Sequence, residues 1–270
     1  MFDRELAVAL KAVNDAAQII MRVYATEFSV HFKGRNDPVT EADRTANVAI
    51  VAALQAAFPD DAICAEEASD AESLAAARRG GRCWFVDPLD GTREFVSRNG
   101  EFCVMVGLAV DGEARLGVVQ APAWNRTLWG VVGEGAFERG VDDVVRALHV
   151  ADSLPSPREA RLVVSRSHMH PGVRHVAEEL GIADMRPCGS VGLKVALVST
   201  GEADLYVHVG PGPKLWDGCA PEAIARAAGA LVTDGSGRPL TYVTDRLPLD
   251  QGLVIAAPAL HAAALAVYPR

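Results

Sequence analysis

A short apolar run that stops abruptly in two carboxylates lies at residues 83–92 and limits how the chain can fold. The run reads CWFVDPLDGT, with Asp87 and Asp90 three positions apart. Pro88 fixes φ and forces a turn, and Gly91 permits a backbone conformation that is closed to most residues. The two carboxylates are therefore expected to converge on one point at the end of a strand.

The first half of the chain predicts two helices followed by strands. Apolar positions recur at steps of three and four from Leu6 to Tyr24, as in an amphipathic helix. A second helix is expected from Thr40, whose side chain can cap the first turn with Asp43 three residues on, to Phe58. Beyond it the apolar runs are short and predict strands at 62–65, 83–86, 102–110, 116–121 and 128–132.

A stretch with two prolines and two serines, 150–157, is the expected boundary between two lobes, residues 1–150 and 151–270. In the second lobe strands are predicted at 161–165, 203–209 and 253–257, and helices at 171–180, 191–200, 220–228 and 259–268. Such alternation predicts βαβ units and a mixed, partly parallel sheet. The first lobe is expected to be α+β with a mainly antiparallel sheet.

Composition bounds the function classes. Half of the 270 residues are apolar, enough for a substantial core, and no apolar run approaches the roughly 20 residues that span a bilayer. The N-terminus lacks the features of a signal peptide, and the five cysteines contain no C-x-x-C pair, which together predict a protein of the reducing cytoplasm. A net charge of -9 argues against nucleic acid and membrane surfaces as partners. An anionic substrate would need compact local positive charge.

A bound metal ion would supply that charge. Carboxylates on one tight turn repel each other, and hard oxygen ligands select magnesium, manganese or calcium over zinc. The Leu89 carbonyl can supply a further oxygen. An Asp-Gly pair is also common in ordinary turns, so a turn without a metal remains open for this segment alone.

Three more acidic positions lie in comparable settings. Asp43 is in the first turn of its expected helix, Glu66 and Glu67 follow the strand at 62–65, and Asp217 precedes the helix expected at 220. Each of them taken alone is also explained by a solvated surface carboxylate or by an acid at the start of a helix.

Taken together, these positions resemble the signature of the lithium-sensitive phosphatases related to inositol monophosphatase, with matching order and spacing across residues 43–229. The signature comprises Asp43, Glu66-Glu67, the run from Asp87 to Thr92, and Trp216-Asp217. The resemblance implies a layered αβαβα fold of the α/β class, one compact unit, that hydrolyses a small phosphorylated metabolite with two or three Mg²⁺ ions. It also carries the expectation of a homodimer.

The resemblance further implies roles for these residues. One ion would be bound by Glu66, Asp87 and the Leu89 carbonyl, and another by Asp87, Asp90 and Asp217. The catalytic set would be Asp43, Thr92 and Glu66, with Thr92 and Asp43 orienting the attacking water. Glu67 would lie outside the ligand set.

Finer features resemble the CysQ-type 3'(2'),5'-bisphosphate nucleotidases, which remove a phosphate from adenosine 3',5'-bisphosphate. The first is DGTREF at 90–95, which continues to RNGEF at 98–102, and the second is SRSH at 165–168. The third is Gly189-Ser190 followed by Lys194 and then by KLWDGCAPE at 214–222. Ser190 and Lys194 could bind the phosphate that is not cleaved, and His168 could line the base or ribose. The plain alternatives are that Ser190 caps the following helix, Lys194 is a solvated helix residue and His168 is an exposed loop residue. The implied substrate-binding set is Asp90, Gly91, Thr92, His168, Ser190, Lys194 and Asp217.

Two alternatives remain open. Nucleotidases of this type often carry an arginine where this chain has His208, so specificity can extend to inositol 1-phosphate or fructose 1,6-bisphosphate. A catalytically silent metal-binding regulatory protein is the alternative of another class, although no expected ligand is missing.

Overall fold

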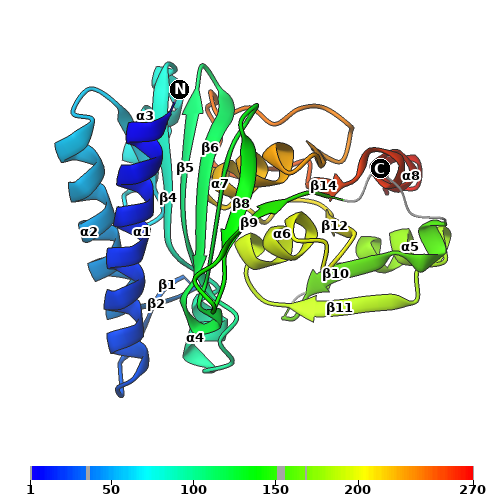
Figure 1. Cartoon of the computed structure of the whole chain (residues 1–270), viewed down its shortest axis with the longest axis horizontal. Helices are drawn as coiled ribbons and strands as arrows, with labels where there is room; N and C mark the ends of the chain where they lie inside the picture. Colours follow the sequence, from blue (N-terminus) through cyan, green and yellow to red (C-terminus); the bar gives the residue numbers. More distant parts are fainter. Residues whose placement is uncertain (1, 35–36, 151–155, 168, 270) are drawn as a thin grey trace.

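The computed structural model describes residues 2–34, 37–150, 156–167 and 169–269. Helices and sheets alternate in five layers, so the expected layered αβαβα architecture is confirmed (Figure 1). The three helical layers are α1 (Asp3–Tyr24) with α2 (Glu41–Ala57), then α6 (Val191–Ser199) with α7 (Leu215–Ala227), then α5 (Pro171–Leu180) with α8 (Pro258–Ala266). Between them lie a seven-stranded and a five-stranded sheet. Among the described residues, no helix is long and apolar enough to cross a membrane.

The seven-stranded sheet keeps its strands in chain order, from β3 to β9. Only the β3–β4 pair, which the helix α3 (Asp70–Arg79) connects, is parallel, so the expectation of a mainly antiparallel sheet is confirmed. Its strands are β3 (Ala62–Ala65), β4 (Arg82–Asp90), β5 (Cys103–Val110), β6 (Glu113–Ala121), β7 (Arg126–Val131), β8 (Gly135–Arg139) and β9 (Val145–Leu148).

The five-stranded sheet has the order β11-β10-β12-β14-β13 and is mixed, as expected. β10 pairs in parallel with β11 and β12, whereas β14 is antiparallel to β12 and β13. Its strands are β10 (Arg161–Ser165), β11 (Asp184–Cys188), β12 (Leu205–His208), β13 (Leu231–Thr233) and β14 (Leu253–Ala256). The hairpin β1 (Val30–Gly34) and β2 (Asp37–Thr40) and the short helix α4 (Thr92–Val96) lie apart from both sheets.

One helix boundary differs from its prediction in a way that affects the site. The helix expected at 220–228 begins five residues earlier, at Leu215. Pro221 favours the start of a helix, since its ring removes an amide donor, and the sequence pattern therefore pointed to Ala220. The structure accepts that proline inside α7, and Asp217 consequently lies in the helix rather than before it.

A row of glycines allows α7 to lie directly on the larger sheet. Gly107, Gly117 and Gly130 are register partners on β5, β6 and β7. A Cβ atom at Gly117 would lie 2.1 Å from the carbonyl oxygen of Ala220, and a Cβ atom at Gly107 would lie 2.6 Å from the amide nitrogen of Ala220. One hydrophobic cluster draws side chains from both sheets and from α7 between them. The glycines therefore set how closely α7 approaches the end of β4.

Candidate active site

Asp87 and Asp90 end β4, which runs four residues farther than the apolar pattern predicts. Asp87 is only 2% exposed, and its Oδ1 accepts a hydrogen bond from the backbone amide of Leu89 at 2.9 Å. Gly91 adopts a φ of +93°, and a Cβ there would lie 2.7 Å from the carbonyl oxygen of Glu101. The turn is thus held by one hydrogen bond and by a close backbone approach that only glycine permits.

Acidic side chains from three regions of the chain meet at this turn. Carboxylate oxygens of Asp87, Asp90 and Asp217 all lie within 4.8 Å of one another. Asp217 comes from the first turn of α7, where its Oδ2 accepts from the amide of Lys214 at 2.6 Å. Glu66 follows β3, and its amide donates to the carbonyl of Val86, next to Asp87, at 3.1 Å. The structure therefore brings Asp87, Asp90 and Asp217 together, with Glu66 near enough for its charge to act on Asp87.

The cluster carries more negative charge than the chain itself balances. Burial, followed by repulsion from Glu66, Asp90 and Asp217, raises the pKa of Asp87 well above its usual range. Burial, followed by the charge of Asp90, raises the pKa of Asp217 to about 6. A buried, crowded set of carboxylate oxygens is the donor chemistry that hard divalent cations prefer, so these residues fit a magnesium-type site.

Asp43 and Thr92 form a hydrogen-bonded pair beside the cluster. Asp43 is 1% exposed, and its Oδ2 accepts from both the amide and the hydroxyl of Thr40, each at 2.7 Å. Its Oδ1 accepts from the Thr92 hydroxyl at 3.1 Å, and the Leu89 carbonyl lies at the same distance from that hydroxyl. Burial raises the pKa of Asp43, although the hydrogen bonds from Thr40 and Thr92 oppose the shift.

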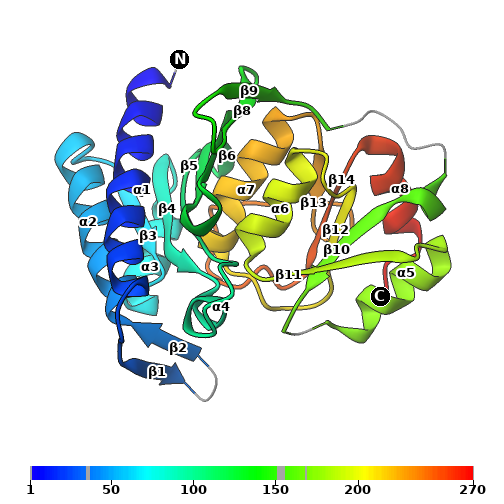
Figure 2. The same cartoon turned by 60° about the horizontal axis from the view of Figure 1, so that its bottom comes forward.

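A cavity of about 510 Å³ opens beside Asp90 and Thr92, next to the start of α6, which lies between the two sheets (Figure 2). The Asp90 Oδ2 accepts from the Ser190 hydroxyl at 2.5 Å and from the Gly192 amide at 2.7 Å. Lys194 is 4% exposed, and its ammonium donates to the Ser190 carbonyl. Gly91, Ser190 and Lys194 thus line one cavity, whereas His168 lies outside the described residues.

Two acidic side chains that follow β4, Glu94 and Glu101, bond to residues far along the chain and were not predicted from the sequence. Glu94, which is buried, accepts from the Ser167 hydroxyl at 2.8 Å. Glu101 accepts from the guanidinium of Arg166 at 2.6 Å and from the amide of Gly189 at 2.7 Å. Both acids belong to the run at 90–102, which showed the resemblance but no role for either of them. Their partners lie more than 60 positions away, beyond any local pattern.

The layered α/β fold and a hydroxyl–carboxylate pair beside an acidic cluster define a hydrolase. Residues 2–268 match the model of the Inositol monophosphatase family, and the chain belongs to this family of phosphatases.

Curated relatives and solved structures agree with this assignment. The 3'(2'),5'-bisphosphate nucleotidase CysQ of Escherichia coli is 37% identical over 88% of this chain and 94% of that protein. The human 3'(2'),5'-bisphosphate nucleotidase 1 is 29% identical over 94% of this chain and 90% of that protein. CysQ from Bacteroides thetaiotaomicron matches with a TM-score of 0.79 at 30% identity, covering 95% of this chain and 98% of that chain. An inositol monophosphatase from Thermotoga maritima matches with a TM-score of 0.81 at 28% identity, covering 99% of this chain and 97% of that chain.

Proposed function

We propose that the protein is a Mg²⁺-dependent phosphomonoesterase that hydrolyses adenosine 3',5'-bisphosphate to AMP and phosphate. The observation that carries the proposal is the joining of the carboxylate cluster, through Asp90, to a cavity that contains Ser190 and Lys194. The names of the Escherichia coli and human relatives support the choice of substrate.

The metal ligands would be Glu66, Asp87, Asp90, Asp217 and the carbonyl of Leu89, holding two or three Mg²⁺ ions. Bound divalent cations supply the positive charge that activates water and stabilises a phosphoryl transition state. The chain contributes the position of its carboxylates, which are presented by β4, by α7 and by the end of β3.

Thr92 would orient the attacking water. Its hydroxyl has two protein acceptors at 3.1 Å, the Asp43 carboxylate and the Leu89 carbonyl, so its single proton points into the protein. The lone pairs of Thr92 Oγ1 are left for a water molecule in the cavity, which would donate to them. Asp43 stays in place because Thr40 donates twice to its other oxygen. The hydrogen-bonded Asp43 and Thr92 thus fix the orientation of the water molecule, and with it the direction of the lone pair that would attack.

Lys194 would bind the phosphate that remains on the nucleotide. Its ammonium lies 5.6 Å from the ring centroid of Tyr206 and contacts the Ser190 carbonyl, so the side chain is held rigidly at the cavity. Burial lowers the pKa of Lys194, and Asp90 is the first of the charges that oppose this shift. A second phosphate would add negative charge beside the ammonium and favour its protonated form.

A second candidate is a phosphatase of inositol 1-phosphate or fructose 1,6-bisphosphate, which His208 favours. This side chain replaces the arginine that the nucleotidases often carry, and its Nε2 has no hydrogen-bond partner among the described residues. Burial lowers the pKa of His208, so at neutral pH it adds no positive charge for a nucleotide phosphate.

Parallel phosphate-release assays at saturating Mg²⁺ would separate these candidates. We expect kcat/KM for adenosine 3',5'-bisphosphate to exceed that for inositol 1-phosphate and fructose 1,6-bisphosphate by about tenfold or more. The matched variant Lys194→Met keeps the buried length and loses the charge, so its KM should rise more for the nucleotide than for inositol 1-phosphate. If the nucleotide is hydrolysed no faster than inositol 1-phosphate, the second candidate replaces the first.

The stabilising effect of Mg²⁺ should depend on pH. The pKa of Asp217 rises from 3.8 to about 6, and that of Asp87 shifts in the same direction, so their contribution to stability is lost as the pH rises through the raised values. Mg²⁺ needs the ionised carboxylates and offsets this loss. Calorimetry should show that saturating MgCl₂ raises Tm by on the order of 5 °C at about pH 8 and by much less at about pH 5. KCl at equal ionic strength is the control, and equal increments from both salts would contradict the metal site.

A further inference from the structure

We propose that Tyr242 and Glu222 are positioning residues for Asp217, holding the first turns of α7 against β4 and so setting the separation of Asp217 from Asp87. The inference rests on the proposed metal site. Neither residue reaches the cavity beside Asp90. Both belong to structures that meet behind the carboxylate cluster: Glu222 to α7, and Tyr242 to the connection between β13 and β14, residues 234–252.

Tyr242 links α7 to the strand that ends in Asp87. Its hydroxyl donates to Glu222 Oε2 at 2.7 Å, and both side chains are buried. The Tyr242 ring centroid lies 5.1 Å from that of Phe85 on β4. Phe85 precedes Asp87 by two positions, so the two side chains leave β4 on the same face. One tyrosine therefore contacts both elements that present the central carboxylates.

The contact with α7 lies at the turn that carries Asp217. Gly218 is the next residue, and a Cβ there would lie 3.0 Å from the hydroxyl oxygen of Tyr242. Gly218 and Glu222 are four positions apart and share one face of the helix. The Tyr242 hydroxyl therefore occupies the space that a side chain at Gly218 would fill. It donates its hydrogen bond to Glu222, one helical turn farther along α7. Loss of that bond would release the end of α7 nearest to Asp87.

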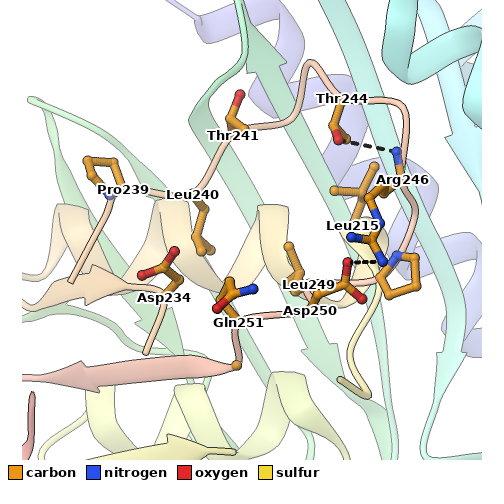
Figure 3. A pocket seen from close by; sticks show the side chains of 12 residues that line it. Leu215, Asp234, Pro239, Leu240, Thr241, Thr244, Arg246, Leu249, Asp250 and Gln251 are labelled. Atoms are coloured by element: carbon orange, nitrogen blue, oxygen red, sulfur yellow. Dashed lines mark hydrogen bonds and ion pairs between the residues drawn. The ribbon is translucent and has the colours of Figure 1, made fainter. Parts of the chain in front are cut away.

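The same connection also holds the segment that leads into α7. The amide of Leu215 donates to the Leu247 carbonyl at 3.0 Å, and the amide of Leu249 donates to the Pro213 carbonyl at 2.8 Å. A pocket of about 230 Å³, which Leu215 and Leu249 line, lies beside this pairing (Figure 3). Leu215 is itself buried in the hydrophobic cluster between the two sheets, together with Leu247 and Leu249, so hydrogen bonds and packing together fix the approach to Asp217.

Glu222 has a second partner on its own helix. Its Oε1 accepts from the guanidinium of Arg226 at 3.1 Å. Burial raises the pKa of Glu222 to about 7, and the bonds from Tyr242 and Arg226 oppose the rise. The carboxyl group accepts the tyrosine hydroxyl whether it is ionised or not, so the link between the two elements persists on both sides of neutral pH.

The test is Tyr242→Phe, which removes the hydroxyl and keeps the ring against Phe85. Mn²⁺ binding is measured by electron paramagnetic resonance without substrate, and kcat is measured as a function of Mg²⁺. We expect the Mn²⁺ Kd and the half-saturating Mg²⁺ to rise about tenfold, while saturating Mg²⁺ restores most of kcat. Tyr268→Phe is the matched control, because that hydroxyl donates to the carbonyls of His208 and Gln251, the latter in the same connection, and neither of these lies on α7.

A second variant guards against a folding defect. Glu222→Leu breaks the same link from the other side, so the double variant with Tyr242→Phe should bind Mn²⁺ no more weakly than Glu222→Leu alone. A lowered Tm with the Mn²⁺ affinity of the Tyr268→Phe control would mean that the pair only stabilises the fold, and would overturn the inference. Absence of Mn²⁺ binding in the wild type would overturn the metal site and this inference together.

Discussion

Asp87→Asn should lower kcat/KM by about 10³-fold or more, because each 1.36 kcal/mol of lost transition-state stabilisation is a factor of ten and a metal site supplies several kcal/mol. Asp87 is the carboxylate that the proposed metal site shares between its ions. Its amide replacement carries no charge and is a poor ligand for a hard cation. The measurement is phosphate release at increasing Mg²⁺, which should not restore the rate.

The same variant should fold as stably as the wild type in the absence of divalent cations. Burial and three neighbouring acids raise the pKa of Asp87, so ionising it costs free energy in the native state, and a neutral amide avoids that cost. Asn can retain the bond from the Leu89 amide that holds the turn. Asp60→Asn, at an exposed position, is the control for the mutation itself. Wild-type turnover in Asp87→Asn would refute the assigned ligand set.

Asp43→Asn should lower kcat by about 10²-fold, the lower end of what a positioned proton acceptor contributes, and leave the Mg²⁺ requirement as it is. An amide at position 43 cannot accept from Thr40 twice and from Thr92 as well, since one of its two atoms is a donor. If the oxygen faces Thr40, the NH₂ group faces Thr92 and donates to its hydroxyl oxygen, which takes up the lone pair that the water needs, while the hydroxyl proton stays on the Leu89 carbonyl. The water would then lose its acceptor.

Stopped assays of kcat and KM over a range of Mg²⁺ concentrations would check this result. Thr92→Ala should lose a similar factor, and the double variant with Asp43→Asn should be no slower than the worse single variant, because both changes disable one pair. Thr40→Ala is the control for capping, since it removes the hydroxyl of the α2 cap, and with it one of the two bonds to Asp43, at a cost of about 1 kcal/mol of stability, but keeps the bond from the amide at position 40 and the Asp43–Thr92 bond. A fast Asp43→Asn enzyme would contradict the water-orienting pair.

Local patterns in the sequence predict many of the helices and strands and the turn that carries Asp87 and Asp90, whereas the layered fold and the joining of the separate acidic positions were expected from the family resemblance. The strand at 83–86 and the capped helix that contains Asp43 are recognisable without neighbours, and β3 matches its predicted bounds. The helix α3 went unpredicted, although Ser69 and Glu72 form a capping box that signals its start.

Other elements carry weak local signals. β11 reads DMRPC, with a proline and charges at the sheet edge, and β9 is exposed along most of its length, so neither shows the alternation of a half-buried strand. β8, β13 and the strands of the β1–β2 hairpin are likewise short, and pairing with their neighbouring strands rather than intrinsic propensity stabilises them.

The contacts that organise the site were not visible in the sequence for a different reason. Tyr242 meets Glu222 and Phe85 only when the connection after β13 returns across α7. Glu101 meets Gly189 only when the two sheets are assembled. Pairs of this kind depend on the tertiary arrangement, and no spacing in a single sequence specifies them.

The row of glycines beneath α7, Gly107, Gly117 and Gly130, determines where the helix that carries Asp217 lies on the larger sheet. A methyl group at Gly117 would meet the Ala220 carbonyl, so the helix would have to lift away from the sheet. Asp217 would move with the helix, so one added carbon atom on the sheet would displace a carboxylate of the proposed metal site. A larger residue at any of these glycines would therefore impair both the folding of the protein and its catalytic turnover.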